Sequence, residues 1–267
     1  MTPGEGIDDS GPSVIVVIPT YDERRNLPLL VEALDTLEVR ILVVDDASPD
    51  GTGQVADDLA RTRLHMSVLH RNGKDGLGRA YGDGFRLALA DGASIVVEMD
   101  ADLSHDPKDM HRLLAELRSG ADVVIGSRYI PGGSTPEWPW PRRFLSRAGN
   151  AYARWALGLP IADATGGYRA FRSDALSLLD PSTCRAVGYG FQVEMAWRAV
   201  ERGLVVREIP IAFHDRRHGR SKMGLAVVLE AMWLVTRWGV ERLARRLLGK
   251  PTPSASAAED AQHPGLP

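Results

Sequence analysis

Three features that are common in other protein classes are scarce in this sequence: cysteine, a leader-like N-terminus and long apolar runs. Cys184 is the single cysteine among 267 residues, which excludes an internal disulfide and favours a reducing compartment. Residues 1–11 are polar and lack a basic start followed by an apolar stretch, so no secretory signal is expected. The most apolar late segment, Leu225–Val240, is interrupted by Glu230 and Arg237, so no segment is expected to span a bilayer unaided.

The sequence also lacks a strong charge of either sign, and it contains no internal repeat. Its 35 acidic and 32 basic residues give a formal net charge of −3. This balance provides no general attraction to nucleic acid, and no nucleic-acid partner is expected. Hydrophobic residues make up 44% of the chain, and glycine and proline are not in excess, so the composition allows a sizeable folded core.

Short β-branched segments alternate with longer helical segments through the first half of the chain. The first of them is a run of Val and Ile that ends at proline, a pattern typical of a strand buried in a parallel sheet. The expected strands are Ser13–Pro19, Val39–Asp45, Met66–Leu69, Ser94–Met99 and Val123–Gly126. The expected helices are Arg25–Leu34, Gly51–Arg61, Leu77–Leu89 and Lys108–Arg118. This alternation predicts an α/β fold with a mainly parallel sheet flanked by helices.

The second half of the chain is less regular and contains no clean linker. Further elements are expected as helices at Arg142–Leu157, Phe191–Arg202 and Leu225–Leu247 and a strand at Val205–Ile211. We therefore predict one domain over residues 13–248, with disordered tails at residues 1–12 and 249–267. The helix within residues 225–248 combines apolar residues with Trp and Arg, and it is expected either to lie at a membrane interface or to pack against the core.

Polar side chains directly follow three of the expected strands. They form the clusters Pro19–Glu23, Asp45–Ser48 and Asp100–Asp102. In open parallel sheets, ligands bind at the C-terminal ends of the strands, so the three clusters are expected to face one crevice. One acidic residue after a strand is more often a helix cap than a ligand, and it is the conjunction of three clusters that favours a site.

Asp100 and Asp102 are the most specific chemical feature of this edge. Their i, i+2 spacing can direct two carboxylates toward a common point, and the small Ala101 between them leaves space. Mg²⁺ and Mn²⁺ prefer oxygen ligands and are often shared between a few carboxylates and a diphosphate. In isolation such a pair is more often a turn with solvated acids, so the surrounding clusters matter for the interpretation.

Basic and glycine-rich segments supply candidate phosphate contacts. Arg128 follows an expected strand, and several cations crowd a late loop that contains Arg216 and Lys222. Such a loop is usually a solvated face, but it becomes a phosphate site if the fold returns it to the crevice. Residues Gly73–Gly78 enter a helix but match neither a P-loop nor a dinucleotide fingerprint. An NAD-dependent oxidoreductase is disfavoured because polar residues, and not a glycine turn, follow the first strand.

Eight motifs in order identify a family resemblance. They are VIPTYDE, VVDDASPDGT, GLGRAYGDG, EMDADLSHDP, VVIGSRY, TGGYRAF, GYGFQVEM and HGRSK. From about Val14 to Met223 the chain resembles the dolichol-phosphate mannose synthase branch of family 2 glycosyltransferases. The resemblance implies a GT-A fold in a single α/β domain with a mixed sheet. It also implies inverting transfer of mannose from GDP-mannose to a polyprenyl or dolichyl phosphate, giving polyprenyl-phosphate mannose and GDP.

The resemblance also implies roles for individual residues. A donor set would contact the guanosine: Pro19, Tyr21, Glu23, Val44 and Asp46. Asp100, Ala101 and Asp102 would lie against the diphosphate and its Mg²⁺ or Mn²⁺. Ser104 stands where some relatives have Gln, which leaves direct metal contact at this position open. Arg128 and Arg216 would hold phosphate, with Lys222 nearby, and Asp102, Arg128 and Arg216 would carry catalysis.

The acceptor chemistry implied by the resemblance needs no general base. A phosphate oxygen is already anionic near neutral pH, so catalysis reduces to placing it in line and neutralising the leaving diphosphate. The alternatives are a polyprenyl-phosphate glucosyltransferase that uses UDP-glucose, and a nucleotide-sugar-binding domain without turnover. We expect the protein to be cytoplasmic and peripheral on the cytoplasmic face of the membrane, either by contacting the membrane surface itself or through a membrane-spanning partner protein.

Overall fold

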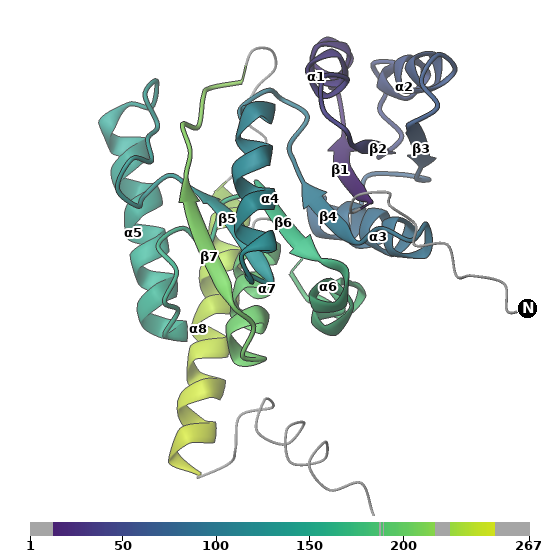
Figure 1. The fold of residues 1–267 in the computed structure, drawn as a ribbon. Helices are drawn as coiled ribbons and strands as arrows, with labels where there is room; N and C mark the ends of the chain where they lie inside the picture. Colours follow the sequence, from purple (N-terminus) through teal and green to yellow (C-terminus); the bar gives the residue numbers. More distant parts are fainter. Residues whose placement is uncertain (1–12, 187, 189, 217–224, 249–267) are drawn as a thin grey trace, which may run out of the picture.

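The computed structural model describes residues 13–186, 188, 190–216 and 225–248 of the chain. Its centre is a 7-stranded sheet in the order β3-β2-β1-β4-β6-β5-β7 (Figure 1). Strand pairing is parallel everywhere except on the two sides of β6, which runs antiparallel to β4 and β5. The strands are β1 (Val14–Thr20), β2 (Arg40–Asp45), β3 (Met66–His70), β4 (Ile95–Glu98), β5 (Val123–Ser127), β6 (Arg169–Arg172) and β7 (Val206–Pro210). The expected mixed, mainly parallel sheet is confirmed.

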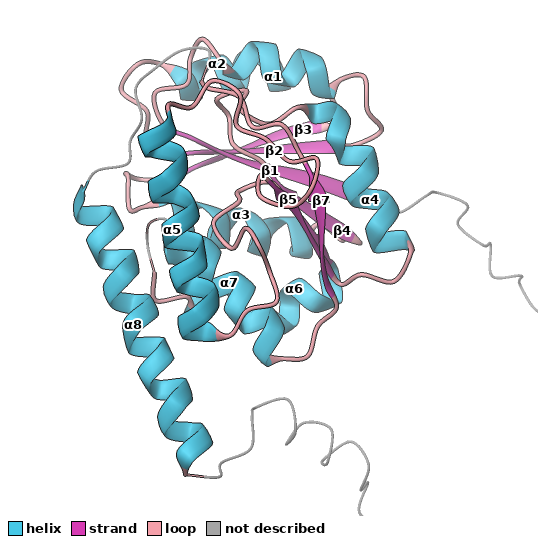
Figure 2. Ribbon diagram, turned by 90° about the vertical axis from the view of Figure 1, so that its left-hand side faces the viewer, coloured by secondary structure: helices cyan, strands magenta, loops and turns pink. Residues whose placement is uncertain are grey.

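Helices cover both faces of the sheet and make three layers (Figure 2). One face is covered by α1 (Leu27–Leu34), α2 (Thr52–Ala60) and α4 (Met110–Arg118). The other face is covered by α3 (Leu77–Ala90), α5 (Trp140–Leu157), α6 (Ser173–Leu179), α7 (Gly190–Glu201) and α8 (Leu225–Leu247). The helical turns η1 (Pro107–Asp109) and η2 (Pro181–Thr183) complete the connections.

The apolar run of β1 explains its central position in the sheet. Val14, Val16 and Ile18 belong to the core beneath α1 and α4, whereas Ile15 and Val17 belong to the core beneath α3. Alternate residues of a strand point to opposite faces, so a strand covered on both faces has to be apolar throughout. Full burial of one such side chain contributes about 1.5–3 kcal/mol relative to exposure.

Every strand and helix expected from the sequence is present, with ends that move by a few residues. The expectation missed α6, and it missed β6 because the segment Arg169–Arg172 begins and ends with arginine. The Arg169 side chain is nevertheless fully buried, since its guanidinium donates to the backbone oxygens of Gly166, Gln192 and Ala164 at 2.8 Å each. The expected tails at residues 1–12 and 249–267 lie outside the described residues.

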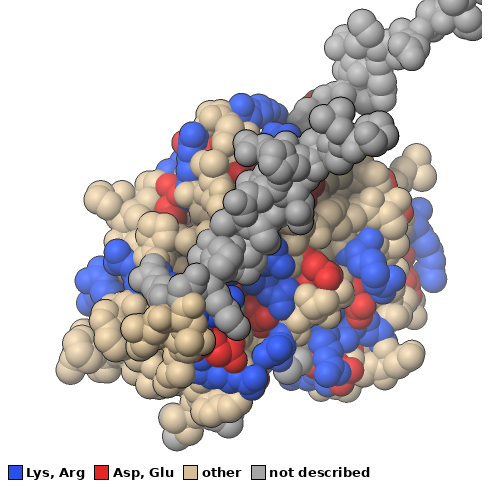
Figure 3. Space-filling view, turned by 90° about the horizontal axis from the view of Figure 1, so that it is seen from below, with Lys and Arg blue, Asp and Glu red and all other residues tan. Residues whose placement is uncertain are grey.

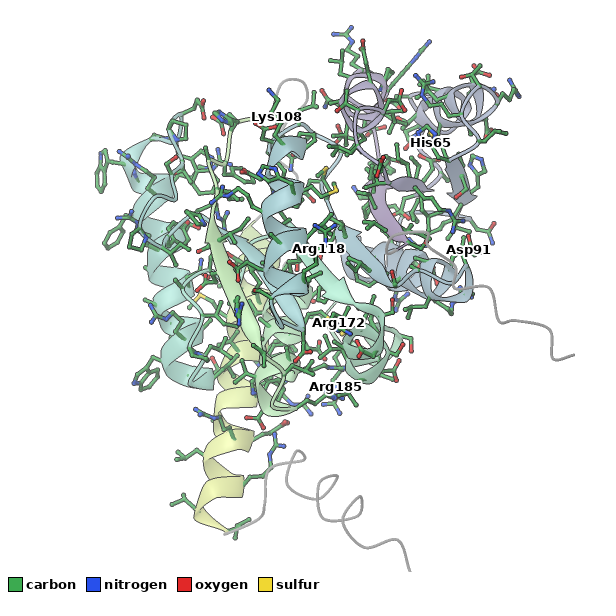
Figure 4. The ribbon with its side chains drawn as sticks, viewed as in Figure 1. His65, Asp91, Lys108, Arg118, Arg172 and Arg185 are labelled. Carbon is green, nitrogen blue, oxygen red and sulfur yellow. The ribbon has the colours of Figure 1, made fainter. Side chains whose placement is uncertain are left out.

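The C-terminal ends of the parallel strands meet at one edge of the sheet, which is the upper edge in Figure 1. The labelled residues of Figure 4 show the direction of α4: Lys108 of η1, just before the helix, lies at its upper end, and Arg118 lies at its lower end. Because β6 is antiparallel, its N-terminal residue Arg169 lies near the same upper edge. Within the described ranges, each helix falls short of the combination of length and apolarity required to cross a bilayer.

Candidate functional site

Three turns at the upper edge contain a non-glycine residue in the left-handed backbone region. Asp22 follows β1 with φ 57°, Ala47 follows β2 with φ 52°, and Leu103 follows β4 with φ 63°. This conformation costs free energy for residues with a side chain, and it persists where surrounding contacts impose it. The first two turns hold one another, because the Asp22 N–H donates to Ser48 Oγ at 3.2 Å and Ser48 Oγ donates to Asp45 Oδ1 at 2.6 Å.

The turn after β1 presents residues that were expected to contact the donor. Glu23 is buried, and its carboxylate accepts a hydrogen bond from Asn26 Nδ2 at 2.7 Å. The Tyr21 ring is half-buried, and Lys74 Nζ lies 3.9 Å from the ring centroid. This cation–π contact joins the glycine-rich segment before α3 to the β1 turn. The two loops therefore border the same part of the site.

Asp46 is held in place by an arginine that the sequence did not single out. Arg71, which follows β3, makes an ion pair with Asp46 through Nη1 and with Asp83 of α3 through Nε at 2.9 Å. Burial raises the pKa of Asp46 above its usual value, although the Arg71 guanidinium acts in the opposite direction. The arrangement fixes the Asp46 carboxylate between β2, β3 and α3.

The remaining two expected donor residues lie within the sheet itself. Pro19 is half-buried near the end of β1 and pairs in register with Val44 of β2. The Val44 side chain is fully buried in the core, where the helix α3 passes closely over it. A contact of Val44 with a nucleotide would therefore involve its backbone and not its side chain.

Asp100 and Asp102 converge at the end of β4, as the sequence predicted. Asp102 is buried, and its Oδ1 accepts a hydrogen bond from the Ser104 N–H at 3.1 Å. Asp100 Oδ1 accepts from the buried Tyr81 hydroxyl at 3.4 Å. Burial, followed by the charge of Asp102, raises the pKa of Asp100 to about 7. Ala101 between them is also buried, and its small side chain belongs to the core beneath α1 and α4.

This pair of acids fits a divalent cation. Burial and then the charge of Asp102 raise the pKa of Asp100, the Arg216 guanidinium acts in the opposite direction, and a bound metal would likewise favour the ionised carboxylate. Ser104 adds a buried hydroxyl oxygen that has no hydrogen-bond partner among the described residues. Among the described residues no group of three or more His, Cys, Asp or Glu is arranged to hold a metal. Two carboxylates supplemented by substrate phosphate are a common environment for Mg²⁺.

Arg216 reaches this acidic pair from the segment that follows β7. Its Nε lies 3.0 Å from Asp102 Oδ2, and its side chain is only 23% exposed. The fold therefore brings Arg216, from the late loop that also contains Lys222, to the end of β4, where it faces a carboxylate. Lys222, expected beside it, lies outside the described residues.

Arg128 lies at the same edge of the sheet, and its guanidinium forms an ion pair with Asp163. Its Nε and Nη2 donate to the two carboxylate oxygens of Asp163 at 2.7 Å each, and Nη2 also donates to Thr165 at 2.8 Å. Arg128 is 8% exposed and Asp163 is completely buried. Burial alone would raise the pKa of Asp163, but the charge and hydrogen bonds of Arg128 outweigh it, so the pKa is lowered. In this structure, Arg128 orders the segment at residues 163–165.

We expect Asp163→Ala to lower the free energy of unfolding by about 3–5 kcal/mol, because it leaves the buried Arg128 guanidinium without its counter-charge. Denaturant unfolding of the parent and the variant measures this loss. Asp174→Ala is the matched control, because the Arg172–Asp174 pair is exposed and should contribute at most about 1 kcal/mol. Equal losses in the two variants would contradict the structural role given to Asp163.

The pH dependence of the same pair has a defined sign. Asp163 has a lowered pKa in the folded chain, so its contribution to stability is present above its ordinary value of 3.8 and is lost as the pH falls through the folded value. The stability difference between the parent and Asp163→Ala should therefore be constant near neutrality and shrink in strong acid.

His105 contacts the backbone of Asp100, one member of the acidic pair. It is 2% exposed, and its ring stacks on Tyr168 with the ring centroids 5.0 Å apart. Burial lowers the pKa of His105 to about 4, so the ring is neutral near pH 7. Its Nδ1 can then accept the Asp100 N–H at 3.4 Å. His105 was visible in the sequence as part of the motif EMDADLSHDP. Its packing on Tyr168 could not be predicted without the order of the strands in the sheet.

The family model described as Glycosyl transferase family 2 matches residues 15–179. The polyprenol monophosphomannose synthase of Mycolicibacterium smegmatis is 48% identical over 240 residues, which covers 88% of this chain and 90% of that protein. The undecaprenyl-phosphate mannosyltransferase of Micrococcus luteus is 49% identical over 229 residues, or 85% of this chain and 94% of that protein.

Solved structures share the fold at low sequence identity. Glucosyl-3-phosphoglycerate synthase from Mycobacterium tuberculosis, solved with Mn²⁺ and UDP, has a TM-score of 0.58 at 20% identity and covers 91% of this chain and 82% of its own. A mannosyltransferase from Pyrobaculum calidifontis, in complex with GDP-Man and Mn²⁺, has a TM-score of 0.54 at 17% identity, with coverage of 95% and 82%. The expected GT-A fold is confirmed, and the chain belongs to glycosyl transferase family 2.

Proposed function

We propose that this chain transfers mannose from GDP-mannose to the phosphate of a polyprenyl phosphate, with inversion at the anomeric carbon. The observation that carries the proposal is the convergence of Asp100, Asp102 and Arg216 at the edge where Tyr21, Glu23 and Asp46 also lie. Mannosyl transfer to a polyprenyl phosphate is further supported by the two curated relatives, which cover most of this chain and are named for that reaction.

In this proposal the donor binds along the upper edge of the sheet, from the end of β2 to the end of β4. The guanosine lies between the β1 turn and Asp46, within reach of Tyr21 and Glu23. Arg71 keeps the Asp46 carboxylate fixed through its second ion pair with Asp83, so the nucleoside pocket is preorganised. The diphosphate then extends toward Asp100 and Asp102.

Asp100 and Asp102 would hold the divalent metal, Mg²⁺ or Mn²⁺, and the buried hydroxyl of Ser104 would be a further oxygen ligand. When bound, the metal supplies positive charge that stabilises the leaving diphosphate. Mn²⁺ is present in the solved M. tuberculosis and P. calidifontis enzymes, which share this fold.

Arg216 and Lys222 neutralise the acceptor phosphate beside the donor. The acceptor carries negative charge and has to approach another anionic group, so cations have to lie between them. Arg216 exchanges its contact with Asp102 for a phosphate oxygen when the substrates bind. The acceptor oxygen attacks C1 of mannose without a general base, the C1–O bond to the diphosphate breaks, and GDP leaves. Arg128 contributes by ordering the adjacent loop through Asp163 and by its positive charge.

The acceptor is a membrane lipid, which places the protein at a membrane surface. We assign it to the cytoplasmic face as a peripheral enzyme, either in direct contact with lipid or held by a membrane-spanning partner.

The donor preference tests the proposal. Purified protein is incubated with a polyprenyl phosphate and, separately, with labelled GDP-mannose and UDP-glucose, and the labelled lipid is extracted and counted. We expect transfer from GDP-mannose to be far better, because the two curated relatives are named for mannosyl transfer. Comparable or better transfer from UDP-glucose would replace the mannosyl assignment with a glucosyl one.

A further inference from the structure

Four aromatic rings lie in a continuous row at the upper edge of the sheet. Trp138 contacts Phe213, Phe213 contacts His105, and His105 contacts Tyr168, with ring centroids 5.4, 5.4 and 5.0 Å apart. Both contacts of Phe213 are edge-to-face, with interplanar angles of 75° and 74°. Such contacts are directional, because the positive edge of one ring meets the negative face of the next. The orientation of the Phe213 ring is therefore fixed on two sides.

Each ring of this aromatic row comes from a different connection of the fold. Trp138 belongs to the loop between β5 and α5, and Phe213 belongs to the segment that follows β7. His105 belongs to the turn after β4 that also contains Asp102, and Tyr168 directly precedes β6. The row therefore joins the segment after β7 to the turn that contains the acidic pair.

Backbone hydrogen bonds attach the segment around Phe213 to the same two connections. The Phe213 N–H donates to the Ser134 oxygen in the loop before α5 at 2.9 Å. The next residue, His214, donates its N–H to the Ser104 oxygen in the turn after β4 at 3.1 Å. Backbone bonds fix the path of the segment, and the partly buried Phe213 ring is the side chain that packs between the two connections.

Arg216 follows Phe213 by three residues, which span at most about 10 Å of chain. The Arg216–Asp102 pair is mostly enclosed, since the two side chains are 23% and 5% exposed. The opposite end of the molecule differs, because Lys and Arg are interspersed there with Asp and Glu on an open surface (Figure 3). Arg40, at the start of β2, pairs with Asp91 in an exposed position, where solvent weakens the pair. The direction of the enclosed Arg216 side chain depends instead on the protein around it.

Arg128 is less dependent on the aromatic row. Its Cζ lies 5.4 Å from the centroid of the Phe213 ring, so the two side chains are in contact. However, both carboxylate oxygens of Asp163 hold the Arg128 guanidinium at 2.7 Å. Loss of the Phe213 ring would leave these two bonds in place. The effect of Phe213 should therefore fall mainly on Arg216.

From these contacts we propose that Phe213 is a positioning residue for Arg216. Its ring, held between Trp138 and His105, sets the point at which the Arg216 guanidinium meets the acceptor phosphate. Phe213 acts through Arg216 and not by contact with a substrate. This inference rests on the proposed function and deepens it, because it names the residue that orients the acceptor-phosphate arginine.

Transfer kinetics of the full chain with Phe213→Leu test the positioning role. Leucine keeps an apolar side chain at this place but removes the ring contacts that fix the orientation. We expect kcat to fall about tenfold to a hundredfold, because a misplacement of about 1 Å can cost about a hundredfold in rate. The affinity for GDP, measured by calorimetry, should be unchanged. If Phe213→Leu unfolds, Phe213→Met takes its place, since methionine adapts to irregular space.

Phe171→Leu is the matched control for the loss of a ring contact. Phe171 of β6 is buried in the core, where its ring centroid lies 5.8 Å from that of Phe85. Its replacement should lower the thermal midpoint and leave kcat near the parent value. A kcat in Phe171→Leu that falls as far as in Phe213→Leu would contradict a specific role for Phe213.

A double-mutant cycle separates positioning from a merely structural contribution. The effects of two residues that act as a unit do not add. In the Arg216→Ala background, Phe213→Leu should therefore lower transfer by less than about twofold. An undiminished effect in that background overturns the proposal, as does a kcat of Phe213→Leu that equals the parent value.

A binding measurement distinguishes failure of this inference from failure of the proposed function. Calorimetry with a short-chain, water-soluble prenyl phosphate, in the presence of GDP and Mn²⁺, measures acceptor-phosphate binding without turnover. We expect Phe213→Leu and Arg216→Ala to weaken this binding and Phe171→Leu to leave it unchanged. If this pattern is found but the parent transfers no mannose, the positioning role stands and the proposed function fails. If the parent transfers mannose and Phe213→Leu matches it in kcat and in binding, the positioning role fails and the proposed function stands.

Discussion

Replacing Asp102 with alanine is expected to abolish nearly all mannosyl transfer while the protein stays folded. The carboxylate is buried beside Asp100, and it is the partner that Arg216 contacts in this structure. Without it, one of the two acids proposed to hold the metal is missing, and the leaving diphosphate loses most of its compensating positive charge. Removal of divalent cations with EDTA is expected to have the same effect on the parent.

Steady-state transfer and thermal unfolding of the same preparations separate chemistry from folding. Asp106→Ala is the matched control, because Asp106 belongs to the same loop but accepts the Lys108 N–H at 2.9 Å and caps η1. This control should retain activity near the parent value. Asp102→Asn keeps a side-chain oxygen that can accept the hydrogen bond from the Ser104 N–H. If the alanine variant unfolds, the asparagine variant tests the loss of the charge in a folded protein. Full activity in thorough chelator would show that the two acids serve another purpose.

Replacing Arg216 with alanine is expected to lower the transfer rate at least a hundredfold, which corresponds to about 2.7 kcal/mol of transition-state stabilisation. Arg216 already lies within 3.0 Å of an anionic oxygen at the centre of the site. A guanidinium can hold two phosphate oxygens at once, a geometry that lysine cannot reproduce, so Arg216→Lys should recover only part of the loss. Binding of GDP alone should change much less, because the proposed nucleoside contacts lie toward β2.

Steady-state kinetics measure the loss of transfer rate, and calorimetry on the same variants measures the change in affinity for GDP. His214→Ala is a suitable control, since His214 lies in the same segment but pairs with Glu137 at 2.9 Å in an exposed position. If Arg216→Ala and Lys222→Ala both transfer at the parent rate, the acceptor site is misplaced and the basic loop is a solvated face.

The sequence predicted the sheet well where local pattern and burial agree. Ser13–Pro19 reads as a buried strand because both faces of β1 are covered, and Asp100 and Asp102 converge because they follow such a strand. The segment Arg169–Arg172 was missed because a strand with a buried arginine looks polar until the backbone oxygens that satisfy it are in place. Its antiparallel direction also depends on contacts that are distant in sequence.

The partners of the site residues were the hardest to predict. Arg128 was expected at phosphate, but Asp163 lies 35 positions away, and nothing local marks it as a counter-charge. Arg71 was missed because it acts through Asp46 and Asp83 on other elements, and His105 was missed because its ring packs on Tyr168, which is distant in the sequence. For α8, interfacial and core packing were alternatives in the sequence. Leu234, Val235 and Trp238 pack in the core, and an interfacial role for the exposed opposite face stays a prediction.

Mass spectrometry of the lipid formed from GDP-mannose and a polyprenyl phosphate tests the central claim most directly. Attack of the acceptor phosphate on C1 adds one mannose to the lipid and releases GDP in equal amount, and this is the result we expect. A lipid that gains mannose together with a second phosphate, with release of GMP, would contradict the account, as would the absence of any mannosylated lipid.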